Sequence, residues 1–147
     1  MAIIADDAGH RVEQLLLVTD RLIGLVTEET RRIDAREPPM EGAEAEEKTR
    51  LANVYRMELG RISQERALIA GAPPALLSKL RQRTETLHAA LGKHEIALNA
   101  VKVVAEGLVQ AMAEEVVRQR GGGASYDARG AKAAPTGPTP AVLDRSA

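Results

Sequence analysis

The chain has 147 residues, with 20 Lys and Arg against 21 Asp and Glu, and a net charge of −1. A near-neutral chain with only 1% aromatic residues lacks the basic surface of proteins that bind nucleic-acid backbones and the stacking surfaces of single-strand binders. It contains no cysteine, which excludes disulfides and thiolate metal sites. We therefore expect no nucleic acid, cofactor or metal among its ligands.

Proline and glycine breakers divide the chain into three predicted helices. Apolar residues at helical spacing predict a first helix over about residues 7–37, capped by Asp6 or Asp7 and ended by Pro38. A second predicted helix, over about residues 41–70, begins with several glutamates, which suit the positive end of the helix dipole. The third, over about residues 74–120, begins at a proline pair and ends at three glycines.

The third predicted helix carries an apolar stripe at alternating steps of three and four residues. This is a heptad pattern sustained for about five heptads, and the helix would be about 70 Å long. The positions of the stripe are Leu77, Leu80, Thr84, Leu87, Leu91, His94, Leu98, Val101, Ala105, Leu108 and Met112.

Short connections between helices favour antiparallel neighbours. The sequence therefore predicts an all-α protein in which residues 1–120 form an antiparallel three-helix bundle with a long C-terminal helix. Because the first two helices are about 30 residues each, the covering of the third should end near Val104. Beyond that point its apolar stripe has no partner within the chain, so we expect it to fray, to self-associate or to bind another protein.

The tail, residues 121–147, is rich in Gly, Pro and Ala and has too few apolar residues to fold alone, so it is predicted to be disordered. It contains one tyrosine, Tyr126, in the segment from Ser125 to Gly130. Composition leaves two interpretations of this tyrosine open. It is either a chance occurrence or a short linear anchor for a partner.

No catalytic constellation is recognisable. Phosphate-binding loops, metalloprotease motifs and nucleophile elbows are missing, and His88 and His94 are six residues apart, on different sides of a helix. We therefore expect a protein that is not an enzyme. The N-terminus has no signal-peptide pattern, and no apolar run approaches the length of a membrane span. The expected location is cytoplasmic, with no integral membrane segment.

The second half of the chain resembles the FlgN family, the export chaperones of the flagellar hook–filament junction proteins. The resemblance covers roughly residues 75–130 and rests on a long apolar helix that carries Asn99, followed by an element like Tyr-Gly-x-x-Gly. Tyr126 and Gly130 match that element, and Asp127 stands where the family has its first glycine.

The resemblance implies a type III export chaperone that holds the C-terminal segments of the junction proteins, prevents their premature assembly and delivers them to the export gate. It assigns gate docking to Tyr126 and Gly130, and it implies a monomer or weak homodimer. The alternative is a structural coiled-coil protein that self-associates through the seam of the third helix. The client-binding residues implied by position are Val101, Val104, Leu108, Val109, Met112 and Val116.

Overall fold

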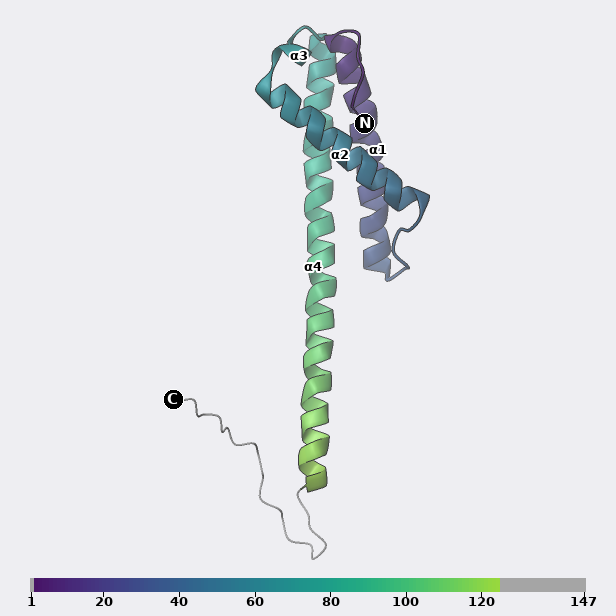
Figure 1. The fold of residues 1–147 in the computed structure, drawn as a ribbon, viewed down its shortest axis with the longest axis vertical. Coiled ribbons are helices and arrows are strands. Elements are labelled where there is room, and N and C mark those ends of the chain that lie inside the picture. The colour runs from purple at the N-terminus through teal and green to yellow at the C-terminus, as the bar shows by residue number, and fades with distance from the viewer. Residues whose placement is uncertain (1, 125–147) are drawn as a thin grey trace, which may run out of the picture. The chain divides into compact units, whose positions relative to one another are not determined.

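The computed structural model describes residues 2–124, which contain helices and no strand (Figure 1). The four helices are α1 (Ala8–Ala35), α2 (Ala43–Gln64), α3 (Ala67–Ala70) and α4 (Pro74–Ala124). The all-α prediction is therefore confirmed for this part of the chain. The chain divides into two units, and the division falls between Val101 and Lys102.

Both ends of α1 are capped. The backbone N–H of His10 donates a hydrogen bond of 2.7 Å to the Asp7 carboxylate, which makes Asp7 the N-cap. At the other end Arg36 takes the left-handed conformation, with a φ of 58°. Its N–H bonds to the Ile33 carbonyl at 3.1 Å, and the Glu37 N–H bonds to the Arg32 carbonyl at 2.9 Å. This pair of bonds is a Schellman motif, and it ends α1 before the prolines.

The predicted single helix over residues 41–70 is wrong, because the chain breaks between α2 and α3. The backbone of Glu65 leaves the helical region, with φ −136° and ψ 87°, although no proline or glycine is present there. The break turns the chain so that Ile69 and Ala72 pack against the core. Tertiary packing thus overrides the local helix propensity of this segment.

The end of α4 also differs from the prediction. The helix continues to Ala124, through the three glycines that were expected to stop it at residue 120. Glycine lowers helix stability by about 1 kcal/mol per residue but, unlike proline, it keeps the backbone donor and so does not forbid a helix.

Within the first unit, α1 and α4 lie side by side and run in the same direction (Figure 1). Asp20 pairs with Arg83 at 2.6 Å, and Glu29 with His94 at 2.9 Å, so residue numbers rise together along both helices. In the same unit, α2 crosses them obliquely instead of running alongside. The predicted antiparallel three-helix bundle is therefore not confirmed as an arrangement.

The core of the first unit joins residues of α1, α2 and α4. On α4, Leu80, Leu87 and Ala97 are buried, whereas Leu91 and Leu98 of the predicted stripe are exposed. Because α2 crosses α4 rather than following it, the flank that carries these two leucines stays uncovered. The buried residues of this core are Val12, Leu15, Leu16, Leu22, Tyr55, Ala72, Leu80 and Leu87.

A buried ion pair between Arg11 of α1 and Glu58 of α2 lies within this packing. Glu58 is only 1% exposed and Arg11 9%. Arg61 adds a longer contact, 3.5 Å from the second carboxylate oxygen of Glu58. Removing one member of such a pair leaves an uncompensated charge in the interior, which is strongly destabilising.

We predict that Glu58→Ala lowers the free energy of unfolding by about 3–5 kcal/mol, because it strands the Arg11 guanidinium in the core. Urea unfolding followed by circular dichroism measures the loss. The matched control is the double variant Arg11→Met, Glu58→Leu. It removes both charges, so its free energy of unfolding should fall much less. A loss below about 1 kcal/mol for Glu58→Ala, the size typical of exposed pairs, would contradict a buried pair.

Candidate partner-binding surface

The residues predicted to bind a partner lie on the second half of α4 and are all exposed. Their exposed fractions lie between 46% for Val116 and 66% for Val109. Val101 is the last residue of the first unit, and the other five belong to the second. We call these five the apolar face of α4: Val104, Leu108, Val109, Met112 and Val116.

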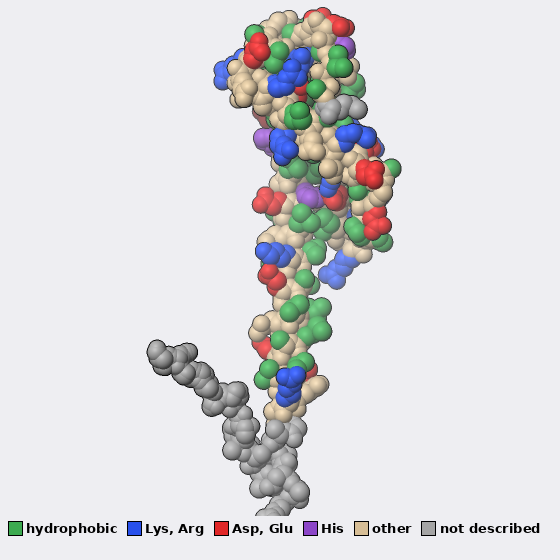
Figure 2. All heavy atoms as spheres, in the orientation of Figure 1, with side chains coloured by type: hydrophobic (Ala, Val, Ile, Leu, Met, Phe, Trp, Pro, Cys, Tyr) green, Lys and Arg blue, Asp and Glu red, His purple; other side chains and the backbone are tan. Residues whose placement is uncertain are grey.

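The apolar face is one side of a helix. At about 100° per residue, its five members fall within an arc of about 140°. Val103 and Val117 are also exposed, but the same periodicity places both on the opposite side. Figure 2 shows hydrophobic side chains on the outside of this part of the chain. A contiguous exposed apolar surface of this kind marks a site of interaction.

Two local ion pairs occupy four of the charged groups of this segment. Lys102 and Glu106 are 3.9 Å apart, and Arg118 lies 2.7 Å from Glu115. The hydrogen bond from Arg118 is the main reason that the pKa of the Glu115 carboxyl lies below its ordinary value. In each pair the two side chains have opposite charges and are three or four residues apart, so these pairs do not create a patch of a single charge. We therefore expect a partner to recognise this surface through apolar contacts.

The predicted gate-docking residues, Tyr126 and Gly130, lie outside the residues that the structure describes. Asn99, which carries part of the family resemblance, is exposed on α4. The structure therefore places the predicted client-binding residues on one helix and leaves the docking element as a prediction.

By length and composition, α4 is a candidate membrane span. Between Pro74 and Gly121, a window of 18 residues has a mean hydropathy of 1.4 and no more than two charged residues, and 6% of it is buried. The sequence-based expectation of no such apolar stretch is therefore wrong as a statement about composition. The core helices of water-soluble proteins pass the same test, but they are mostly buried, unlike this window. The criterion considers length and composition only, so it assigns no membrane to this chain.

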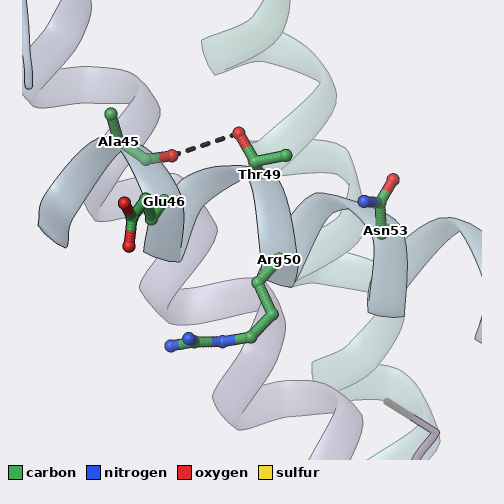
Figure 3. Close-up of a pocket in the computed structure, with 5 residues that line it drawn as sticks. All are labelled: Ala45, Glu46, Thr49, Arg50 and Asn53. Carbon is green, nitrogen blue, oxygen red and sulfur yellow. Dashed lines mark hydrogen bonds between the residues drawn. The ribbon is translucent and has the colours of Figure 1, made fainter. Parts of the chain in front are cut away.

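One further hollow lies on α2. The hollow in Figure 3 is lined by residues of α2 alone. Between its lining residues, the hydrogen bond drawn joins the Thr49 hydroxyl to the Ala45 carbonyl at 3.1 Å. Because no second element faces these side chains, they do not form a site with acid, base and nucleophile together. Among residues 2–124, no cluster of His, Asp and Glu has an arrangement that would hold a metal ion.

A polar cluster joins α1, α2 and α4 within the first unit, and no spacing in the sequence indicates it. Glu29 of α1 contacts Lys48 of α2, and the Nε2 atom of His94 lies 2.9 Å from a Glu29 oxygen. His94 is therefore a half-buried polar residue of the seam. Burial raises the pKa of the Glu29 carboxyl, but the hydrogen bond and charge of Lys48, with those of His94, bring it below the ordinary value of 4.5.

Comparison with known proteins finds the flagellar basal-body protein FlbY of Caulobacter vibrioides (strain ATCC 19089 / CIP 103742 / CB 15). It is 39% identical to this chain over 120 residues, which are 82% of this chain and 80% of that protein. No family model matches the chain. No solved structure matches it either. The flagellar part of the resemblance is thus confirmed, and the FlgN family itself is not what the comparison identifies.

We predict that the contacts of Glu29 with Lys48 and His94 make the free energy of unfolding depend on pH in the acidic range. Because the pKa of Glu29 is lower in the folded chain, its contribution is present above about pH 4.5 and is lost as the pH falls through the folded value. Urea unfolding at a series of pH values should show the free energy of unfolding falling below about pH 4.5. Glu29→Gln and Lys48→Met should each flatten that dependence. If these variants show the same fall in the free energy of unfolding with pH as the wild type, Glu29 and its partners are not the cause of the dependence.

Proposed function

The chain belongs to the family of the flagellar basal-body protein FlbY, and on this premise we propose that it serves flagellar assembly as an export chaperone in the cytoplasm. In this proposal it binds the C-terminal segments of the hook–filament junction proteins, keeps them from assembling early and delivers them to the flagellar export gate. The family membership supports the flagellar role. The chaperone role is supported by the exposed surface of α4 and by the resemblance to the FlgN family.

The observation that carries the proposal is the apolar face of α4. Its side chains are exposed, although an isolated helix is marginal in water and gains most of its stability from burying one face. An amphipathic segment laid on this face would bury apolar side chains of both partners. Full burial of one Val, Leu or Met contributes about 1.5–3 kcal/mol, so a few such contacts are enough for reversible binding. While bound, the segment is unavailable for assembly.

Self-association through the same face is the second candidate, because the heptad stripe is also the pattern of a coiled coil. In that case the protein is structural and the partner is a second copy. Sedimentation of the full chain at micromolar concentration separates the two. A stable dimer that buries residues 104–117 favours the structural role, and a monomer or weak dimer favours the chaperone.

Docking on the export gate is proposed for Tyr126 and Gly130, on the family resemblance alone. We predict that Tyr126→Ala leaves binding of the junction proteins unchanged and weakens binding to the export gate. Pull-down of each partner with the purified variant measures the two activities separately. Equal loss of both would refute this division of labour.

The central prediction concerns the middle of the apolar face. The double variant Leu108→Asp, Met112→Asp should abolish co-purification of both junction proteins and reduce motility, because it places two carboxylates where apolar contact is needed. The helix should still form, since both positions are exposed.

The chain provides a matched control for this variant. Val103→Asp with Val117→Asp changes two residues of similar exposure, about 40° apart like the first pair, on the opposite side of the helix. This control should bind the junction proteins like the wild type, and cells that carry it should swim normally. If neither junction protein co-purifies with the wild type, or if the Leu108, Met112 variant stays motile, the chaperone proposal is wrong.

A further inference from the structure

The apolar face of α4 is wider than the seam of a two-stranded coiled coil. In the heptad register of the stripe, Ala105 and Met112 take position a and Leu108 takes position d. The flanking positions are apolar as well. Val104 and Ala111 stand at g, and Val109 and Val116 stand at e.

A single partner helix covers positions a and d. In two-stranded coiled coils the e and g positions border the solvent and usually carry Glu or Lys. Here both borders carry valine, and Val104 and Val109 are as exposed as Leu108, at 62%, 66% and 60%. One partner helix packed on positions a and d would therefore leave the valines of both borders at the edge of the solvent. An apolar stripe of this width is typical of a helix that faces two neighbours in a bundle.

The charge pattern limits where the partner makes apolar contact. Glu115 occupies the next d position, so the stripe ends there. Its carboxylate is held by Arg118 at 2.7 Å and by the side-chain amide of Gln119 at 3.1 Å. Because a buried carboxylate needs paired donors, a partner that reaches Glu115 must be polar or basic at that point and apolar over residues 104–112.

We propose that the apolar face of α4 binds two helices of one partner at once, as a helical hairpin or a packed pair, and not a single helix. Residues 104–112 of α4 then form the third member of a three-helix bundle. One partner helix packs on the Val104 border and the other on the Val109 border, and a basic or polar residue of the partner lies beside Glu115. This inference rests on the proposed chaperone function and specifies the shape and chemistry of the client segment.

Three single substitutions in the full-length chain test the inference. Val104→Glu alters one border, Val109→Glu alters the other, and Val103→Glu is the control on the opposite side, at 59% exposure. Glutamate forms helices better than valine, so all three variants should fold. Dissociation constants for each purified junction protein are measured by calorimetry.

The two border variants should each weaken binding by about tenfold or more, because each loses a buried valine and introduces a buried charge. The control should bind like the wild type. A wild-type chain that binds while one border variant retains full affinity overturns the two-helix inference and leaves the chaperone proposal intact. A wild-type chain that binds neither junction protein overturns both.

Discussion

The organisation of this protein depends on a helix that is longer than the helices available to cover it. A helix in water is stabilised mainly by burial of one apolar face against other elements. α4 has 51 residues, whereas α1 has 28 and α2 has 22. At about 1.5 Å per residue, α1 can accompany only about half of α4. Residues 98–121 of α4 are all exposed.

The first unit supplies the stability that this arrangement needs. Its core packs Leu80 and Leu87 of α4 against residues of α1 and α2. The polar contacts follow the same geometry, because Arg83 and His94 of α4 both bond to acidic residues of α1. The Arg11–Glu58 pair adds little net stability, since the cost of removing two charges from water largely offsets their attraction.

Much of the fold could be predicted from local signals. The prolines at 38, 39, 73 and 74 mark real helix boundaries, and the exposure of the predicted client-binding residues follows from comparing helix lengths. The break at Glu65 could not be predicted, because it depends on packing of Ile69 and Ala72 rather than on a breaker residue. The exposure of Leu91 and Leu98 also depends on how α2 crosses, which heptad spacing does not encode.

The site divides in the same way. Hydrophobic periodicity and the length of α4 locate the apolar face. The spacing of its valines and leucines does not identify the protein that covers it. The burial of Glu58 was missed for a related reason. An arginine-rich helix face looks solvated in sequence, and only the crossing of α2 over α1 brings Glu58 against Arg11. The flagellar assignment rests on the similarity to FlbY, and composition alone contains no signal of it.

Amide hydrogen exchange along α4 tests the central claim most directly. If a partner protein covers the apolar face, residues 101–116 should exchange rapidly in the isolated chain and slowly after addition of a hook–filament junction protein. The amides of α1 should be protected equally in both conditions. Protection of residues 101–116 in the isolated chain, or exchange unchanged by the junction protein, would contradict the account.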